Sequence, residues 1–370
     1  MKVLTVIGNR PQFIKAAAVS PRLRSDHEEL LVHTGQHFDD ELSAVFFSEL
    51  GLPAPEVELG IALGSNSSQT ARMLGALEPV VSSAAPDALL VYGDTNSTLA
   101  GALAGAQAGV PVAHVEAGMR AYDRAMPEEL NRVLTDHASS LLLCSSSVAV
   151  ANLRSEAVSG TVELIGDVMV DVALTVQPRA RERVDLVALR GLEPGRYLLA
   201  TAHRAGNVDD LGRLRLLVEL LLAMPPPVLF TVHPRTRRRL DEADLLARLE
   251  SSGRVIVAPP LGYLEMAALL CHARAVLTDS GGLQKEAYLA GVPCVTLRSS
   301  TEWTETVERG WNVLVDLDRE AARSAVLRSP PADRPPLYGD GHAGARVVAA
   351  LERLVAVLER VGPPPRLQVQ

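Results

Sequence analysis

Two carboxylates stand at corresponding places after two consecutive apolar runs in the first third of the chain. Asp94 follows the run over residues 88–92, and Glu116 follows the run over residues 110–115. The segment between the runs, residues 99–109, is rich in Ala, Leu and Gly and predicts a short helix, so the whole indicates a strand–helix–strand unit. Because open parallel sheets bind ligands at the carboxyl ends of their strands, we expect both carboxylates to face one site.

Each carboxylate also has a purely structural interpretation. Asp94 could cap the helix that follows it, and Glu116 could pair with Arg120. Their occurrence at matched strand ends favours a shared chemical role. Glu128 is a third acidic candidate, in the first turn of a helix that begins at Pro127. Acidic residues suit the first turn of any helix, so for Glu128 alone the structural interpretation is the stronger one.

The corner after the first strand offers two cations. Gly8 allows the backbone to turn before a helix, and Arg10 and Lys15 lie near the start of that helix. Free backbone N–H groups already favour an anion at such a place. The pattern therefore indicates an anion-binding corner, with surface charge on a helix as the alternative.

A stronger anion motif lies in the second half of the chain. Ser280, Gly281 and Gly282 follow an apolar run and open a helix, so their backbone amides and the hydroxyl can close on a diphosphate. Glu286 comes about one turn later, where its carboxylate could accept hydrogen bonds from ribose hydroxyls. The alternative for Glu286 is a solvated helix glutamate.

Two histidines follow strand-like runs of the same half. His203 comes after residues 197–200 and could bind a phosphate or move a proton, or else be a packed hinge residue. His233 is a weaker candidate of the same kind. Acids from one half and an anion cradle with a histidine from the other predict proton transfer on a sugar attached to a nucleotide. The sequence shows no nucleophile elbow, metal-binding cluster, Walker motif or dinucleotide fingerprint.

The elements that position these residues alternate between strand and helix. Strand-like runs cover residues 3–7, 30–33, 88–92, 110–115, 141–144 and 162–165, and then residues 197–200, 228–232, 255–258, 275–277, 294–297 and 313–315. Helical patterns lie between most of them, as over residues 40–50 and 68–83. Two sets of six strands alternating with helices predict an α/β protein of two doubly wound parallel sheets, with a site between the two domains.

We place the domain boundaries by composition. The chain of 370 residues suits two domains. A charged, helical linker runs over residues 171–195 and ends in a Pro-Gly turn signal. We expect an N-terminal domain over residues 1–172, a second domain over residues 173–345, and a C-terminal helix with a flexible tail over residues 346–370.

Composition restricts the partners. A net charge of −8 argues against nucleic acid, whose recognition needs a basic face. No apolar run reaches the roughly 18 residues of a membrane span, and Met1-Lys2 leads directly into a strand without a signal peptide. The three cysteines lie in apolar runs without metal spacing, as expected of thiols in a reducing cytosol. We therefore expect a cytoplasmic protein.

The ordered motifs resemble those of the non-hydrolysing UDP-N-acetylglucosamine 2-epimerase family over about residues 1–350. They are GNRPQFIKAA, HTGQHFD, YGDTNSTLA, HVEAGMR, PEELNR, TAHR, PPLGYLEM, LTDSGGLQKEAYLAGVPC and TEWTETVERGWNVLV. HVEAGMR and TDSGGLQKEA are the specific ones. Several variants resemble a branch with archaeal-type epimerases and enzymes acting on 2,3-diacetamido uronic acids.

The resemblance implies two Rossmann-like domains of glycosyltransferase-B type with the active site in the inter-domain cleft, a homodimer, and no metal or nicotinamide cofactor. It implies inversion at carbon 2 of the sugar by anti elimination of UDP through a 2-acetamidoglucal and re-addition of UDP. The matching positions are, as acid/base candidates, Asp94, Glu116 and Glu128; for departure of UDP, His203; for the diphosphate, Arg10, Ser280, Gly281 and Gly282; for the ribose, Glu286; and lining the site, Lys15 and Arg132.

Two segments depart from the family pattern. Gly206 replaces an acidic residue in the motif His-Arg-x-Glu-Asn, and a Gly-Ser-His-Gly-like loop reads Gly-Ser-Asn-Ser-Ser over residues 64–68. In many bacterial relatives a second UDP-sugar binds near these segments as an activator, and Gln36, Gln69 and His233 match there. The departures leave open a hydrolysing enzyme that releases UDP and N-acetylmannosamine, or an epimerase of a modified UDP-2-acetamido sugar. A glycosyltransferase and a nucleotide-sugar sensor are the remaining alternatives.

Overall fold

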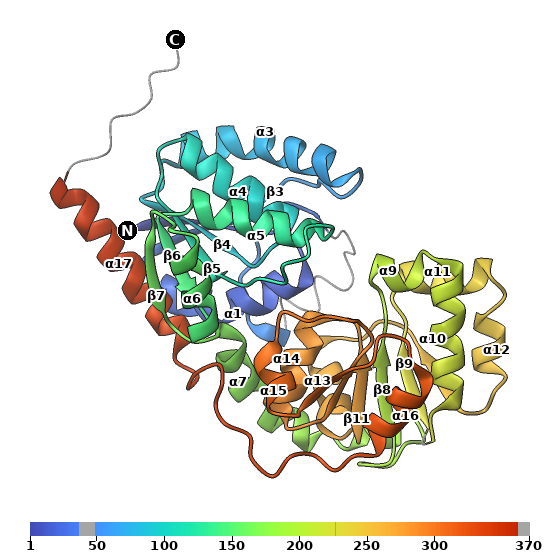
Figure 1. Ribbon diagram of the computed structural model, residues 1–370. Helices are drawn as coiled ribbons and strands as arrows, with labels where there is room; N and C mark the ends of the chain where they lie inside the picture. The colour runs from blue at the N-terminus through green and yellow to red at the C-terminus, as the bar shows by residue number, and fades with distance from the viewer. Residues whose placement is uncertain (37–48, 226, 362–370) are drawn as a thin grey trace. The chain divides into compact units, whose positions relative to one another are not determined.

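The chain forms two compact units in the computed structural model, which describes residues 1–36, 49–225 and 227–361 (Figure 1). The first unit comprises Met1–Val172 and the chain from Pro336 onward, and the second comprises Ala173–Pro335. Each unit is built on one parallel sheet, so the expected class of two doubly wound α/β domains is confirmed.

The first unit contains a seven-stranded parallel sheet in the order β3-β2-β1-β4-β5-β6-β7. Its strands are β1 (Lys2–Ile7), β2 (Glu28–His33), β3 (Val57–Glu58), β4 (Ala88–Tyr92), β5 (Val112–Ala117), β6 (Leu141–Cys144) and β7 (Thr161–Leu164). Its helices are α1 (Arg10–Asp26), α3 (Asn66–Ala84), α4 (Asn96–Gln107), α5 (Pro127–Ala138), α6 (Ser147–Ser155) and α17 (Ala343–Val361). The predicted six strands were one too few, because β3 has only two residues and leaves no periodic pattern. The helix predicted over residues 40–50 falls almost wholly on residues 37–48, outside those described.

Small residues let α4 lie close to the sheet. A side chain at Gly101 would meet Val91 at 2.9 Å, and one at Gly105 would meet Val112 at 2.7 Å. These contacts are tighter than real Cβ atoms show, so a larger residue at either place would force the helix or the valine side chains to shift. The close approach fixes the start of α4 just beyond the end of β4, where Asp94 lies.

The C-terminal segment completes the first unit. The sequence predicts that residues 336–345 close the second domain, whereas in the structure they join the first. The backbone carbonyl of Tyr338 accepts from the Asp167 N–H at 2.7 Å. The buried Asp171 carboxylate accepts from the N–H groups of Ala343 and Gly344 at 3.0 and 2.9 Å, which caps α17. Helix α17 then packs against α1, so it is part of this unit.

The second unit contains a six-stranded parallel sheet in the order β10-β9-β8-β11-β12-β13. Its strands are β8 (Leu198–Thr201), β9 (Val228–Thr231), β10 (Val255–Ala258), β11 (Ala275–Thr278), β12 (Cys294–Thr296) and β13 (Asn312–Leu314). The surrounding helices are α8 (Asp185–Ala188), α9 (Ala205–Val208), α10 (Leu211–Ala223), α11 (Pro234–Glu242), α12 (Leu246–Glu250), α13 (Tyr263–Cys271), α14 (Gly281–Ala290), α15 (Thr304–Glu308) and α16 (Arg319–Leu327). The chain passes from the first unit to the second between Val172 and Ala173, within helix α7 (Val168–Glu182). This point lies inside the linker predicted over residues 171–195.

Helices cover the faces of both sheets, and the order of the strands reverses near the centre of each sheet. In the second unit Leu198 and Ala200 pack in the apolar cluster of α10, while Leu199 packs in that of α13 and α14. The order of the strands reverses between β1 and β4 in the first sheet and between β8 and β11 in the second. Ligands of such sheets bind beyond the strand ends at these reversals. No helix among the described residues is long and apolar enough to cross a membrane.

Candidate functional site

Asp94 lies at the reversal point of the first sheet. Gly93, with φ +67°, turns the chain after β4 and directs Asp94 toward α5. The Asp94 carboxylate accepts from Nε and Nη2 of Arg132 at 3.0 and 2.6 Å, and 30% of its side chain stays exposed. The following helix is capped by Thr95 in a capping box with Thr98. The carboxylate therefore pairs with Arg132 on α5, and the capping role falls to the next residue.

Glu116 lies in a strained part of β5. Its φ of +73° is unusual for a residue other than glycine, and the pairing of β5 with β6 shifts register between Val115 and Ala117. The bulge turns its carboxylate toward Lys15 of α1, with which it forms an ion pair. Both side chains are about nine-tenths buried. Arg120 pairs with Asp136 and Glu156, so the predicted alternative of a Glu116–Arg120 pair is not what forms.

Gly93 shows how close these groups lie. A methyl group at this position would come within 3.0 Å of Lys15 Nζ and 3.5 Å of Glu116 Oε2. The turn that carries Asp94 thus packs directly on the Lys15–Glu116 pair. Two carboxylates and two cations, Arg132 included, gather at one edge of the sheet, as the strand ends predict.

The remaining candidates of the first unit surround this group. Arg10 is the first residue of α1, half-buried beside the cap residue Asn9. Glu128 is half-buried in the first turn of α5, one turn before Arg132 and on the same face of the helix. Its neighbour Glu129 is buried and binds the N–H groups of Ala121 and Tyr122, a structural role that the sequence left unassigned.

Gln36 and Gln69 both contact the start of α4. Gln36 Oε1 accepts from the Ser97 N–H at 3.0 Å and from its hydroxyl at 2.6 Å. Gln69 Oε1 accepts from Asn96 Nδ2 at 2.7 Å, and its own amide donates to the Ala62 carbonyl. These two predicted effector residues therefore lie near the turn that carries Asp94.

In the second unit, Asp279 organises the loop after β8. Its fully buried carboxylate accepts from the backbone N–H groups of His203 and Arg204 at 3.1 Å, and from Asn207 Nδ2 at 3.1 Å. The His203 ring stays 42% exposed, and its centre lies 5.9 Å from that of His233. The structure thus brings the two predicted histidines together and links them to the residue directly before Ser280.

The predicted diphosphate cradle forms the start of α14. Ser280 is the N-cap residue, and its hydroxyl makes no capping bond to the helix. Gly281 is buried against Glu302, whose carboxylate would overlap any side chain at this position, while Gly282 is exposed. Glu286 follows on the same helix, half-buried. Glu302 also pairs with Arg298 at 3.0 Å, which places a further cation near this corner.

Three buried residues of the site escaped sequence reasoning: Asp279, Asp136 and His114. Burial tends to raise the pKa of Asp136, but the charge and hydrogen bonds of His114 and of Arg120 outweigh it and hold that pKa below its usual value. The sequence carries no local signal for these contacts because each joins residues far apart in the chain. Among the described residues, no group of three His, Cys, Asp or Glu side chains could hold a metal ion.

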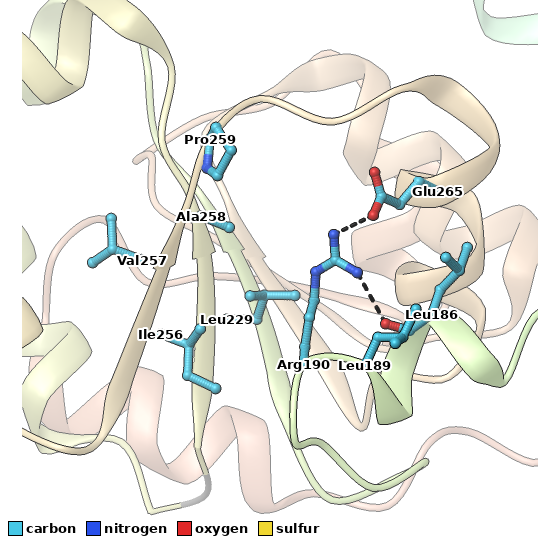
Figure 2. Close-up of a pocket in the computed structure, with 9 residues that line it drawn as sticks. All are labelled: Leu186, Leu189, Arg190, Leu229, Ile256, Val257, Ala258, Pro259 and Glu265. Atoms are coloured by element: carbon cyan, nitrogen blue, oxygen red, sulfur yellow. Dashed lines mark hydrogen bonds and ion pairs between the residues drawn. The ribbon is translucent and has the colours of Figure 1, made fainter.

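A cavity elsewhere in the second unit contains none of the predicted site residues. It measures about 470 Å³ and lies beside β10, lined by Leu186, Leu189, Arg190, Leu229, Ile256, Val257, Ala258, Pro259 and Glu265. Figure 2 shows Arg190 turned toward Glu265 and toward the Leu186 carbonyl. Its two charged side chains pair with each other across the cavity wall.

Known proteins match the sequence of this chain over nearly its whole length. The sequence profile of the family described as UDP-N-acetylglucosamine 2-epimerase matches residues 22–352. A UDP-2,3-diacetamido-2,3-dideoxy-D-glucuronate 2-epimerase of Pseudomonas aeruginosa is 45% identical over 366 residues, covering 96% of this chain and 100% of its own. A UDP-N-acetylglucosamine 2-epimerase homolog of Methanococcus maripaludis is 43% identical over 357 residues, with the same coverage.

A solved structure of a similar protein has the same fold over nearly the whole chain. The UDP-GlcNAc 2-epimerase of Methanocaldococcus jannaschii, crystallised in complex with UDP-GlcNAc and UDP, superposes with a TM-score of 0.90. It is 38% identical to this chain and covers 95% of it and 100% of its own length.

Proposed function

Because the chain belongs to the UDP-N-acetylglucosamine 2-epimerase family, we propose that it inverts carbon 2 of UDP-N-acetylglucosamine, interconverting it with UDP-N-acetylmannosamine. The observation that carries this proposal is the group at the first reversal point. Asp94 and Glu116 lie near each other there, and each forms an ion pair with a cation. Inversion needs a proton acceptor on one face of carbon 2 and a donor on the other, which two fixed carboxylates can supply.

The proposed reaction proceeds by elimination and addition. A carboxylate removes the proton on carbon 2 while the bond from carbon 1 to the UDP oxygen breaks on the opposite side, giving a 2-acetamidoglucal and UDP. A second carboxylic acid returns a proton to the other face of carbon 2, and UDP adds back to carbon 1. Asp94, Glu116 and Glu128 are the proposed acid/base groups, and their ion pairs and helical placement fix the geometry that proton transfer requires.

In this proposal, residues of the second unit make most of the contacts with UDP. The N–H groups at the start of α14 and the Ser280 hydroxyl, which makes no capping bond, suit a diphosphate. Glu286, further along the helix, would accept from the ribose hydroxyls. His203 would help UDP depart, since its exposed ring can donate to the leaving oxygen. Arg10 would add a further positive charge toward the diphosphate.

A modified sugar is a second candidate substrate. The 45% identical relative is named for a UDP-2,3-diacetamido-2,3-dideoxy-D-glucuronate, whose carbon 2 chemistry is the same. We propose measuring kcat/KM for this compound and for UDP-N-acetylglucosamine side by side, following the epimers by proton NMR and free UDP by chromatography. Epimers without stoichiometric UDP support the proposal. Free UDP with N-acetylmannosamine indicates a hydrolase, and no turnover of either compound refutes the epimerase assignment.

We also propose that the protein is a homodimer, on the strength of its resemblance to the family. Light scattering coupled to gel filtration should give twice the mass of the chain. A single-chain mass at micromolar concentration would contradict this.

A further inference from the structure

A buried histidine that the proposed mechanism does not use lies on the strand that carries Glu116. His114 is on β5 and is wholly inaccessible to solvent. Its Nδ1 lies 2.7 Å from Asp136 Oδ1, and its Nε2 lies 2.7 Å from the carbonyl oxygen of Gly93. The other oxygen of Asp136 accepts from the Gly118 N–H at 3.1 Å and from Arg120 Nη2 at 2.8 Å.

Both ring nitrogens of His114 therefore face acceptors. The Gly93 carbonyl can only accept, and Asp136, whose Oδ2 receives the Gly118 N–H and the Arg120 guanidinium, is a carboxylate. A neutral imidazole donates from one nitrogen alone and would leave a lone pair against an oxygen. The geometry calls for a ring with a proton on each nitrogen.

The surrounding charges support a buried cation. Arg120 forms a second, two-bond ion pair with Glu156, at 2.7 Å for each bond. With His114 protonated, two cations and two carboxylates balance within the cluster, and Glu156, a quarter exposed, also lies 3.6 Å from Nε2 of His137. Buried charges are tolerated only when they are paired and hydrogen-bonded.

The partners of this pair belong to the two turns that carry the acid/base candidates. Gly93 directly precedes Asp94, and its N–H also donates to the Val115 carbonyl at 3.0 Å. Gly118, bound by Asp136, lies two residues after Glu116, whose left-handed backbone conformation costs energy and needs support. One buried pair thus fastens both turns to β5 and α5.

We propose that His114 and Asp136 are positioning residues: a buried imidazolium–carboxylate pair that holds Asp94 and Glu116 in place for proton transfer. The expected effect on kcat rests on the proposed epimerase function. The protonation state of His114 and its contacts with the two segments that carry Asp94 and Glu116 do not depend on that function.

The protonation state is tested without any substitution. Neutron diffraction from crystals of the whole protein, exchanged into deuterium oxide near neutral pH, should show deuterium on both Nδ1 and Nε2 of His114. A bare Nδ1 or Nε2 would overturn the inference. Because this measurement needs no substrate, it stands even if the epimerase assignment fails.

The positioning role is tested with His114→Gln, in which the amide nitrogen can donate to one acceptor while the amide oxygen opposes the other. We expect kcat to fall about tenfold to a hundredfold with KM within about threefold, since small misplacements of reacting groups cost that much. The exposed His342, in the same unit, gives the matched control His342→Gln, for which kcat should be unchanged. A folded His114→Gln protein with kcat within about threefold of wild type would overturn the proposal.

A second variant covers a failure of the first to fold. Asp136→Asn keeps the shape but places an amide among three converging donors, and it should show the same split between kcat and KM. If the wild type does not epimerise either nucleotide sugar, the crystal structure of the variant decides instead. Displacement of the Gly93 carbonyl and of the Asp94 side chain supports positioning, and unchanged positions overturn it.

Discussion

Replacement of Asp279 by alanine tests the structural role that the second unit gives to this carboxylate. Three donors converge on it: the N–H groups of His203 and Arg204, and the Asn207 amide. A buried donor left without an acceptor costs about 1 kcal/mol or more, so Asp279→Ala should destabilise the second unit by about 3 kcal/mol. For a unit of this size that corresponds to a fall of about 6–12 °C in its melting temperature.

The chain offers a selective probe for this unit. Its two tryptophans, Trp303 and Trp311, are both buried in the second unit, so tryptophan fluorescence follows the unfolding of that unit alone. Thermal melts of Asp279→Ala and of an exposed control, Asp241→Ala, should differ by the amount above. A melting temperature lowered by less than about 2 °C would show that water or neighbouring groups replace the carboxylate, and would refute the assignment of Asp279 as the anchor of the His203 loop.

Four further predictions concern individual groups. Asp94→Asn and Glu116→Gln should each lower kcat by about 10²–10⁴-fold with a much smaller change in KM, measured by steady-state kinetics; near-normal turnover in both would exclude them as acid/base groups. Ser280→Ala should weaken UDP binding by about one to two decades in calorimetry, because a hydrogen bond to a charged phosphate is lost, and an unchanged affinity would remove UDP from this corner. Hydrogen bonds from an arginine hold the pKa of Glu156 below its ordinary value of 4.5, so its stabilisation is complete above that pH and is lost as the pH falls through the lower folded value. Glu156→Gln should therefore lower the free energy of unfolding by up to about 1 kcal/mol at neutral pH, with a deficit that shrinks below about pH 4; a deficit independent of pH would contradict the ion pair. Gly206 has open space around its Cβ position, so Gly206→Glu should fold and introduce a sigmoidal dependence of rate on UDP-N-acetylglucosamine. Reduced release of UDP by the variant would instead show that this glycine permits leakage of the intermediate. If neither the rate dependence nor the release of UDP changes, the glycine is a neutral replacement.

Local patterns predicted the sheets well because buried parallel strands are continuous apolar runs. All six strands of the second unit lie within one or two residues of the predicted ends, and only the two-residue β3 was missed in the first. The position of the C-terminal segment was not predictable in this way. Its return to the first unit depends on Asp171 capping α17, a contact between residues more than 170 positions apart.

The same difference between local patterns and long-range contacts applies to the candidate site. Asp94, His203 and Ser280 follow strand ends, and strand ends are visible in a sequence. The contacts that orient them are not: Arg132, placed at the site by the family resemblance alone, pairs with Asp94 from the buried face of a helix, and Asp279 reads as the last residue of an apolar run. The conformation of Glu116 is likewise hidden, because a bulge in a parallel strand arises from tertiary contacts and leaves no mark in the residue pattern.

The fate of the proton on carbon 2 shows whether epimerisation passes through elimination and proton transfer. The enzyme is incubated with UDP-N-acetylglucosamine in deuterium oxide, and the recovered nucleotide sugars are examined by proton NMR and mass spectrometry. Reversible elimination predicts that both epimers gain one deuterium at carbon 2 while UDP remains attached to the sugar at equilibrium. Epimers that form without deuterium at carbon 2 would contradict proton transfer through the carboxylates of the first unit.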